Sequence, residues 1–312
     1  MRALVTGVAG QDGSLLAELL LQEGHEVVGT IRRDAPTPPG VETVFADLLD
    51  PDSLRHAVAG AAADRVFHLA APTFVPESWA QPVETFTAIA AATAVILDAA
   101  TAARPEARIF LASSGEVFGD ACESPQRESS PMRPRTPYGV AKLAALQLGR
   151  VWRERGAHVS SGILYNHESE RRPERFVTRK VTRGAAAIAL GLQDELVLGD
   201  LDAVRDWSAA RDLMRAALLM VAQDEPRDYV LASGRGRTVR ELVATAFAAA
   251  GLDPEGRVRV DPAFVRPPET TPQVGDASLA RERLGWEPAT SFEELIAQMV
   301  RTDLDDLRRG AA

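Results

Sequence analysis

The sequence predicts an α/β fold in which a doubly wound parallel sheet is joined to a second, smaller α/β domain. Two observations support this prediction. The first half of the chain alternates short β-branched runs with longer amphipathic stretches, and the loops between them are short. This order implies parallel strands joined by right-handed crossovers. We therefore expect residues 1–165 to form the first domain and residues 166–312 the second, with some segments interleaved.

Apolar periodicity places the individual elements. In the first half the expected strands are Ala3–Val5, Glu26–Thr30, Glu42–Phe45, Arg65–Leu69, Arg108–Ala112 and His158–Leu164. The expected helices are Gly13–Gln22, Leu54–Ala59, Thr85–Ala99 and Tyr138–Glu154. In the less regular second half we expect helices at Phe176–Leu190, Ala209–Gln223, Thr238–Ala249 and Phe292–Arg308, and strands at Glu195–Leu198, Asp228–Ala232 and Arg257–Val260.

Composition excludes several classes of protein. The chain has 312 residues, of which 46% are hydrophobic and 25% charged, as in ordinary globular proteins. Its net charge of −9 argues against nucleic acid as a partner. The single cysteine, Cys122, excludes an internal disulfide and a cysteine-rich metal site, and we expect no metal. No uninterrupted apolar run approaches the ~20 residues of a membrane-spanning helix, and no signal-peptide pattern is present. We expect a cytoplasmic enzyme that does not bind membranes.

A glycine-rich turn follows the first expected strand. Gly7, Gly10 and Gly13 stand in GxxGxxG spacing and enclose Gln11 and Asp12. Glycine there permits a tight turn and lets backbone N–H groups approach a pyrophosphate at the helix N-terminus. The alternative is an ordinary strand–helix turn. Because the strand and helix that the motif requires are both expected here, the pattern favours a Rossmann-type dinucleotide site.

The end of the second strand discriminates between NADP and NAD. Arg32 and Arg33 stand where an acidic residue would bind the ribose of NAD. Two guanidinium groups suit a 2′-phosphate, so NADP is favoured. A solvated basic pair, or a ribose held by Asp34, are the alternatives. Further residues expected beside the cofactor at strand ends are Asp47, Leu48, Leu69, Ala70 and Ala71.

A candidate catalytic group lies at the end of the fifth expected strand and in the helix after it. Tyr138 and Lys142 are four residues apart and share one helix face. A nearby ammonium group favours the phenolate, so we expect Tyr138 to act as a base. Ser114 is placed to hydrogen-bond a hydroxyl group, and Glu116 is a second candidate base. The alternatives are a surface Tyr–Lys pair and a solvated loop carboxylate.

Together, the glycine turn, Ser114 and Tyr138-x-x-x-Lys142 resemble the extended short-chain dehydrogenase/reductase family. Several longer segments narrow the resemblance to the GDP-mannose 4,6-dehydratase family. The most specific segment is NHES…RR…FVTRK between Asn166 and Lys180. The others are TGVAGQDGSLLAELLLQEGHEV, PRTPYGVAKLAA, LGDLDAVRDW and LGWEPATSFEELIAQMV.

The resemblance implies a nucleotide-sugar dehydratase that keeps its dinucleotide bound and regenerates it in each cycle. Tyr138 would deprotonate the hydroxyl on sugar carbon 4, and Glu116 would remove the proton on carbon 5. Ser114 would orient the substrate, and Lys142 would hold the nicotinamide ribose. Cofactor-contacting positions of the family match His167 and Arg172. Substrate-contacting positions are expected at Thr73, Glu116, Asn166, Val177, Lys180, Arg205, Arg266 and Glu269.

Charge is distributed unevenly along this acidic chain. The six basic residues of one thirteen-residue stretch are Arg171, Arg172, Arg175, Arg179, Lys180 and Arg183. A local basic patch suits a diphosphate ligand. The alternative is a solvated helix face.

Three departures from the dehydratase pattern keep other functions open. Pro72-Thr73-Phe74 replaces the family's Gln-Ser-His, Gly115 stands between Ser114 and Glu116, and Phe118 replaces a tyrosine. Ser114-Gly115-Glu116 and the step from Phe74 to Val75 look closer to the related reductases of GDP-4-keto-6-deoxy sugars. The alternative function is therefore an NADPH-dependent reductase, or an epimerase, of such a sugar. A non-catalytic NADP-binding regulator is a third possibility. The loop after Arg33 is short, so we expect a homodimer built on helices Thr85–Ala99 and Tyr138–Glu154.

Overall fold

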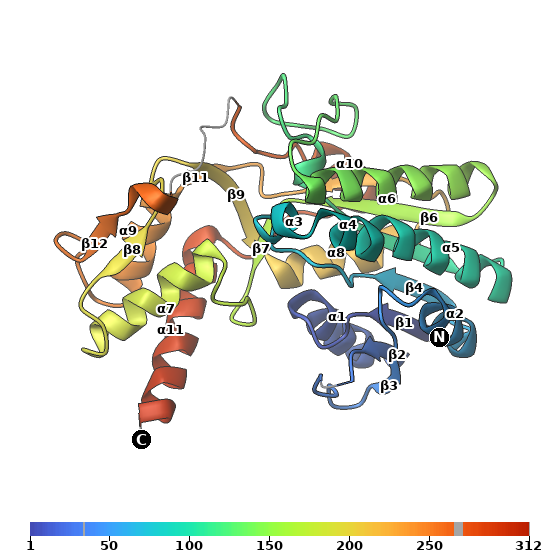
Figure 1. Cartoon of the computed structure of the whole chain (residues 1–312), viewed down its shortest axis with the longest axis horizontal. Coiled ribbons are helices and arrows are strands. Elements are labelled where there is room, and N and C mark those ends of the chain that lie inside the picture. Colours follow the sequence, from blue (N-terminus) through green and yellow to red (C-terminus); the bar gives the residue numbers. More distant parts are fainter. Residues whose placement is uncertain (34, 265–270, 312) are drawn as a thin grey trace.

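Seven parallel strands form the main sheet of the protein (Figure 1). The computed structural model describes residues 1–33, 35–264 and 271–311. The strand order is β3-β2-β1-β4-β5-β6-β10, and each neighbouring pair is parallel. The predicted Rossmann-type fold is therefore confirmed. The strands are β1 (Arg2–Thr6), β2 (Glu26–Ile31), β3 (Glu42–Phe45), β4 (Arg65–His68), β5 (Arg108–Ser114), β6 (His158–Leu164) and β10 (Asp228–Leu231).

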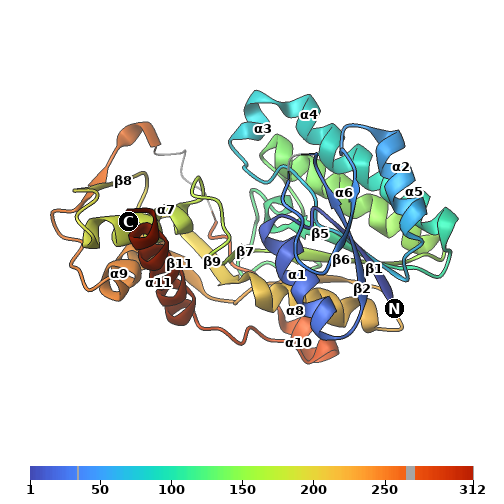
Figure 2. The same ribbon diagram turned by 90° about the horizontal axis from the view of Figure 1, so that it is seen from below.

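Helices cover both faces of this sheet (Figures 1 and 2). They are α1 (Gln11–Gln22), α2 (Pro51–Ala61), α3 (Glu77–Ala80), α4 (Pro82–Phe86), η1 (Thr87–Ala91), α5 (Ala92–Ala103), η2 (Gly115–Val117), α6 (Pro137–Glu154), α8 (Ala210–Ala222) and α10 (Ser278–Leu284). Side chains alternate along β1 between the two faces. Ala3 and Val5 pack with α1 and α8, whereas Leu4 packs with α2 and α5. Burial on both faces explains the continuous apolar runs of the strands.

One helix is longer than predicted. The sequence predicts Thr85–Ala99, whereas α4, one π-helical turn and α5 run from Pro82 to Ala103. An 18-residue window of this 22-residue helix has a mean hydropathy of 1.7, so the helix is long and apolar enough to cross a membrane by length and composition alone. The sequence argument considered only uninterrupted apolar runs and did not single out this helix. Alanines and threonines separate the larger apolar side chains of this helix, so its sequence does not stand out as one apolar run. Half of the stretch is buried, and it packs against α2 and α6, as core helices of soluble proteins also do.

The chain returns to the first sheet after residue 209. Helix α8, strand β10 and helix α10 pack with α1 in one hydrophobic core. Trp286 fixes the last part of this return, because its indole Nε1 donates to the carbonyl oxygen of Asp212, 2.9 Å away. Residues of the second half thus complete the sheet that carries the glycine turn.

The remaining elements form a smaller α/β region at the carboxyl ends of the main strands (Figure 1). A three-stranded sheet has the order β11-β9-β7, and β8 pairs with β12. Helices α7, α9 and α11 pack together on an apolar core. The elements are β7 (Asn166–Glu168), α7 (Val177–Ala189), β8 (Leu196–Leu198), β9 (Val204–Ala209), β11 (Gly236–Thr238), α9 (Val239–Ala249), β12 (Val258–Val260), η3 (Pro262–Phe264) and α11 (Phe292–Ala311).

Strand β9 is the main element that the sequence pattern did not predict. Its polar residues Arg205 and Asp206 hide the strand signal. Asp206 is fully buried and accepts hydrogen bonds from the backbone N–H groups of Ser233, Gly234 and Gly275. A buried carboxylate satisfied by loops distant in sequence is invisible to a periodicity argument. Strand β7, strand β11 and helix α10 are too short for that argument.

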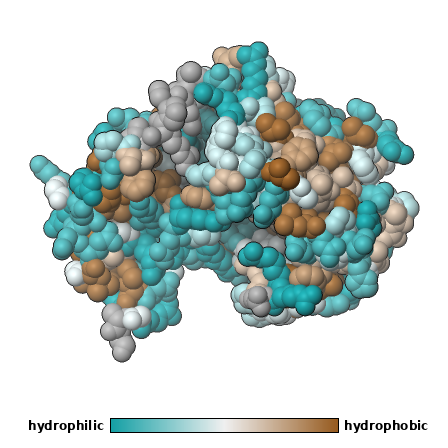
Figure 3. Space-filling view, viewed as in Figure 1, coloured by the Kyte–Doolittle hydropathy of each residue, from teal (hydrophilic) through white to brown (hydrophobic). Residues whose placement is uncertain are grey.

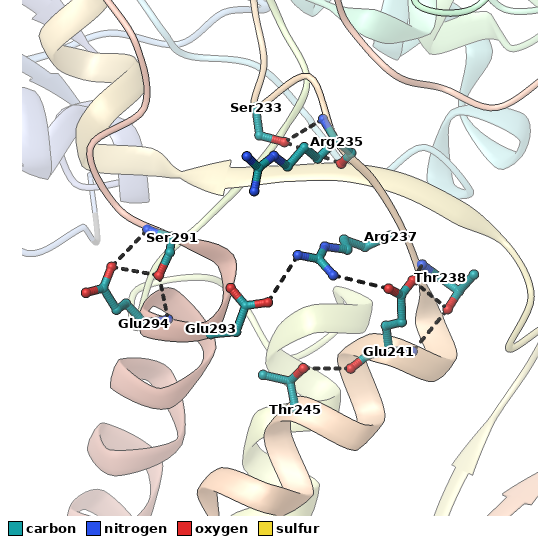
Figure 4. A network of polar contacts seen from close by, with 9 residues as sticks. All are labelled: Ser233, Arg235, Arg237, Thr238, Glu241, Thr245, Ser291, Glu293 and Glu294. Carbon is teal, nitrogen blue, oxygen red and sulfur yellow. Dashed lines mark hydrogen bonds and ion pairs between the residues drawn. The ribbon is translucent and has the colours of Figure 1, made fainter.

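Figure 4 shows the polar contacts that join α9 to α11. Thr238 and Glu241 form a capping box at the start of α9. Arg237 donates to Glu241 on one side and to Glu293 of α11 on the other, at 3.2 and 3.1 Å. Beside these contacts lies a groove of about 570 Å³. It mixes arginines with carboxylates, and none of the predicted site residues lines it.

Candidate active site

The turn between β1 and α1 has the geometry of a dinucleotide cradle. Gly7 has a φ of +70°, in the left-handed region that favours glycine. A Cβ atom on Gly13 would lie 2.3 Å from the carbonyl oxygen of Gly7, and so would fill the turn. Gly10 caps α1 without a side-chain hydrogen bond. The first-turn N–H groups are therefore available for an anion.

The end of the neighbouring strand, at Ala70, approaches this turn closely. A Cβ atom on Gly7 would lie 3.0 Å from the Cα of Ala70. Thr6 fixes that approach, because its Oγ1 accepts the backbone N–H groups of Leu69 and Ala70 at 3.0 and 3.1 Å. Ala71 follows and contacts the small core around Tyr138. The loop from residue 69 to 71 therefore connects the cofactor cradle to the catalytic group.

A guanidinium–aromatic pair lies where the sequence predicts the 2′-phosphate of the cofactor. Arg33 lies over the Phe45 ring, 4.7 Å from its centroid, and both residues are exposed at the ends of β2 and β3. Arg32 is exposed beside it. Asp47 and Leu48 follow β3, and the Asp47 carboxylate accepts the N–H of Leu49 at 2.9 Å. Asp34, the alternative ribose ligand, lies outside the described residues.

The four predicted catalytic residues come together at the end of β5. Ser114 Oγ accepts the backbone N–H of Glu116 at 3.2 Å and hydrogen-bonds the Tyr138 side chain. The first turn of α6 lies against η2, since a Cβ atom on Gly139 would be 2.7 Å from the Glu116 carbonyl oxygen. Lys142 Nζ donates to the carbonyl oxygen of Ala112 at 2.7 Å. The four residues thus lie at one site, and the charge of Glu116 acts on the Tyr138 phenol.

Electrostatics at Tyr138 differ from the expectation. Burial raises the pKa of the Tyr138 phenol well above its ordinary value, and the charge of Glu116 adds to this, while the hydrogen bond with Ser114 acts in the opposite direction. Burial also lowers the pKa of Lys142 to about 8. In the sequence argument Lys142 favours the phenolate. In the structure its ammonium group lies 5.8 Å from the Tyr138 ring centroid and donates to the Ala112 carbonyl oxygen.

His167 contacts the cofactor cradle through Asp12. Its Nε2 lies 2.8 Å from Asp12 Oδ2, and its Nδ1 lies 2.7 Å from the Tyr165 carbonyl oxygen. Arg172 packs over the Phe176 ring at 3.7 Å and pairs with Glu168 at 3.1 Å. Asp12 and Arg172 both act electrostatically on Tyr138, so this group borders the catalytic residues.

Of the predicted substrate residues, Asn166, Val177, Lys180 and Arg205 lie on β7, α7 and β9 of the smaller region. Val177 begins α7, and Lys180, one turn later, lies 5.0 Å from the Phe264 ring centroid. Asn166 of β7 is paired in register with Trp207 of β9, two residues beyond Arg205. Thr73 lies in the loop after β4, whose Phe74 contacts Phe176 edge to face at 5.6 Å. Arg266 and Glu269 lie outside the described residues.

The basic stretch does not form an open cationic patch, so that prediction was wrong for its arginines. Each arginine of the stretch pairs with a carboxylate. Arg179, for example, is buried and pairs with the buried Asp303 at 2.7 Å. The other pairs are Arg171–Glu18, Arg172–Glu168, Arg175–Glu77 and Arg183–Glu174. Glu18, Glu77 and Asp303 come from distant parts of the chain, whereas Glu168 and Glu174 lie beside or within the stretch. A count of the basic residues alone reveals neither kind of partner.

Two further residues near the site were missed by sequence reasoning. His68, at the end of β4, lies beneath Lys142 with its Nδ1 2.9 Å from Thr6 Oγ1. Burial and the charge of Lys142 lower the pKa of His68 to about 3. Ser169 Oγ donates to Gln11 Oε1 at 2.9 Å. No local motif marks either residue. Among the described residues, no group of three His, Cys, Asp or Glu side chains is placed to hold a metal ion.

A family model described as GDP-mannose 4,6 dehydratase matches residues 4–299. The chain belongs to the GDP-mannose 4,6-dehydratase family. A GDP-mannose 4,6-dehydratase from Sinorhizobium fredii is 41% identical over 98% of this chain and 97% of its own length. The resemblance inferred from the motifs is confirmed.

Solved structures share the fold of this family member. RMD from Pseudomonas aeruginosa in complex with NADPH has a TM-score of 0.84 and 27% identity, over 98% of this chain and all of that one. DesIV, a dTDP-glucose 4,6-dehydratase from Streptomyces venezuelae with NAD and TYD bound, has a TM-score of 0.85 and 25% identity, over all of this chain and 98% of that one. One neighbour thus binds NADPH and the other NAD.

Proposed function

We propose that this protein converts GDP-mannose to its 4-keto-6-deoxy product with loss of water. The observation that carries the proposal is the convergence of Ser114, Glu116 and Tyr138 beside a dinucleotide cradle, in a chain of this family. Dehydration needs a base for the carbon 4 hydroxyl and another for the carbon 5 proton. The site offers a phenol and a carboxylate as separate groups for these two tasks.

The cofactor that we propose is NADP. The Gly7–Gly13 turn would hold its pyrophosphate, and Arg32 and Arg33 would hold a 2′-phosphate. When bound, a nicotinamide dinucleotide supplies hydride chemistry, taking up a hydride from the sugar and returning it later. Lys142, whose ammonium group is already fixed by the Ala112 carbonyl, would bind the nicotinamide ribose.

The side chains divide the proton transfers. Ser114 would hydrogen-bond the carbon 4 oxygen and align it with Tyr138, which takes the hydroxyl proton. The resulting ketone acidifies the proton on carbon 5, and Glu116 removes it. The proton taken from carbon 5 would be passed to the carbon 6 hydroxyl, which leaves as water. Return of the hydride to carbon 6 and of a proton to carbon 5 would complete the 4-keto-6-deoxy product. Because Tyr138 and Glu116 act electrostatically on each other, ionisation of one opposes ionisation of the other. We propose that they therefore act in successive steps.

The substrate would occupy the space between the two regions, and its nucleotide would contact the smaller one. Val177 and Lys180 in the first turn of α7, Asn166 of β7, Arg205 of β9 and Thr73 after β4 are the described residues that we assign to it. Lys180 is the residue of the basic stretch that we assign to the diphosphate. Arg266 and Glu269 complete the assignment from the sequence pattern.

A reductase of GDP-4-keto-6-deoxy sugars is the second candidate function. The Ser114-Gly115-Glu116 sequence and Phe74 favour it. Gly115 is not sterically required, because the nearest atoms to a Cβ atom there would be those of the Tyr165 ring, at 3.4 Å. The retained carboxylate of Glu116 has a use in dehydration and none in simple reduction. We therefore place the reductase second.

Product mass distinguishes the two functions. We expect incubation with GDP-mannose and no added reductant to give a product lighter by one water. Unchanged GDP-mannose, together with unchanged members of a panel of other nucleotide hexoses, would refute the proposal. Consumption of NADPH in proportion to product from a 4-keto-6-deoxy sugar nucleotide would instead establish the reductase.

We further propose that the protein is a homodimer and that it works in the cytoplasm, away from membranes. Exposed apolar side chains gather over α3, α4 and α6, and Figure 3 shows this area in brown. Trp79 is 64% exposed and Val83 79%, with Phe86, Val140 and Val151 also exposed. Burying such a patch stabilises association. We expect light scattering to show a dimer, which Val83→Asp converts to a monomer. A stable tetramer would contradict the proposal.

A further inference from the structure

The cofactor cradle is tied directly to β7 and the turn after it, more than 150 residues away in sequence. Gln11 Nε2 donates to the His167 carbonyl oxygen at 3.1 Å, and Gln11 Oε1 accepts from Ser169 Oγ at 2.9 Å. Asp12 Oδ2 lies 2.8 Å from His167 Nε2. Gln11 and Asp12 are the first two residues of α1, within the glycine turn. The contacts thus hold one region of the protein against the N-terminus that would bind the pyrophosphate.

Hydrogen-bond chemistry fixes the charge of the Asp12–His167 pair. The Tyr165 carbonyl oxygen at His167 Nδ1 can only accept, and an ionised carboxylate at Nε2 can only accept. Both ring nitrogens must then donate, so the imidazole is an imidazolium. The pKa values agree. Burial alone would raise the pKa of Asp12, but His167 and Gln11 bring it down to about 2, and Asp12 keeps the pKa of His167 above its ordinary value despite burial.

Strand β7 also contacts α7, the helix that carries the proposed substrate residues Val177 and Lys180. Glu168, which lies between His167 and Ser169, is buried and accepts from Thr178 Oγ1 at 2.5 Å. Thr178 is also buried, in the first turn of α7. Asp12 is therefore linked to α7 through His167, Glu168 and Thr178. The side chains of Glu168 and Thr178 are buried, and those of Asp12 and His167 are mostly buried. Because the local dielectric constant is low there, the hydrogen bonds between these side chains are stronger than in water.

We propose that the Asp12–His167 ion pair and the Gln11–Ser169 hydrogen bond form a latch that retains the dinucleotide between turnovers. The inference rests on the proposed function, because it assumes that the cradle binds a dinucleotide. His167 and Ser169 act in it as positioning residues. They hold residues 166–172 beside the cradle, and the dinucleotide leaves only when these contacts open. Slow release through such a latch would keep the cofactor bound while it is oxidised and reduced within one catalytic cycle.

Release of bound NADPH measures the latch without any turnover. The protein is loaded with NADPH, excess NADP⁺ is added, and the loss of bound-state fluorescence gives the dissociation rate constant. We expect His167→Gln and Ser169→Ala each to speed release about 10- to 100-fold, the factor for one lost hydrogen bond to a charged or buried partner. The matched control is Glu18→Gln, which breaks the exposed Arg171–Glu18 pair between the same two segments. We expect it to change the rate less than about threefold.

The outcomes separate the latch from the proposed function. Wild-type release rates in both variants, in protein that still turns over GDP-mannose, would overturn the latch alone. Failure of the wild-type protein to bind NADPH or NADH would overturn the dinucleotide site itself. If His167→Gln does not fold, Ser169→Ala decides, since it removes one hydroxyl and leaves the ion pair intact. Equal acceleration by Glu18→Gln would also count against the latch.

Discussion

The substitution Gly13→Ala tests the cradle by adding one methyl group. In a helix, alanine is favoured over glycine by about 0.5–1 kcal/mol. At Gly13, however, the new Cβ atom would lie 2.3 Å from the Gly7 carbonyl oxygen and 2.7 Å from the Val8 Cα. Ordinary contacts begin at 3.4 Å, so the turn must open by about 3.4 − 2.3 = 1.1 Å. Both obstacles are backbone atoms, so a side-chain rotation cannot relieve the clash.

Opening the turn by that distance affects both binding and stability. A backbone hydrogen bond to the pyrophosphate would lengthen from about 2.9 Å to about 4 Å and be lost. We expect NADP(H) to bind about 10- to 100-fold more weakly, the effect of losing one charge-assisted hydrogen bond. Overpacking should also lower the free energy of unfolding by about 1–3 kcal/mol.

Gly60→Ala is the matched control for this prediction. Gly60 also lies in a helix, α2, and a Cβ atom there meets nothing within 4 Å. We expect this variant to be slightly stabilised and to bind NADP(H) normally. Fluorescence titration and chemical denaturation of both variants provide the measurement. Normal binding and a raised unfolding free energy in Gly13→Ala would refute the geometry of the cradle.

Three further predictions concern the catalytic group and its surroundings. Glu116→Gln should lower dehydration of GDP-mannose about 10²- to 10⁴-fold, by mass spectrometry of the product, whereas a rate near wild type would remove the carboxylate from the mechanism. Tyr138→Phe should lower the rate by at least about 100-fold in the same assay, and a smaller loss would assign the first proton transfer elsewhere. The pKa of His68 is about 3 in the folded protein and about 6.5 unfolded, so its stability contribution is full above about pH 6.5 and is lost as the pH falls. Between about pH 8 and pH 5, the free energy of unfolding should therefore fall by about 2 kcal/mol more for the wild-type protein than for His68→Gln. Chemical denaturation across this pH range measures both, and an equal fall in the two proteins would contradict the prediction.

The sequence predicts the main sheet well because its signals are local. Apolar runs, a glycine turn with φ of +70° at Gly7, and Pro137 at the start of α6 each act within a few residues. The catalytic spacing of Tyr138 and Lys142 is likewise set by one helix. Their approach to Ser114 follows from parallel topology, since the first turn of α6 lies against the carboxyl end of β5 and the turn η2 that follows it.

Features that depend on distant partners could not be predicted. The arginines after Arg171 read as an open patch until the structure supplies their carboxylates, such as Asp303 for Arg179. The Tyr138 pKa depends chiefly on how deeply the phenol is buried, which the spacing of Tyr138 and Lys142 does not reveal. The Asp12–His167 pair joins residues 155 positions apart. None of these has a local sequence signature.

The most direct test of the proposed reaction follows one labelled hydrogen. GDP-mannose carrying deuterium on sugar carbon 4 is incubated with the protein and with no added reductant, and the product is examined by NMR and mass spectrometry. If the protein takes a hydride from carbon 4 and returns it within the same site, the deuterium will appear on carbon 6 of a product that has lost one water. Loss of the label to solvent, or a product that retains the carbon 6 hydroxyl, would contradict the account.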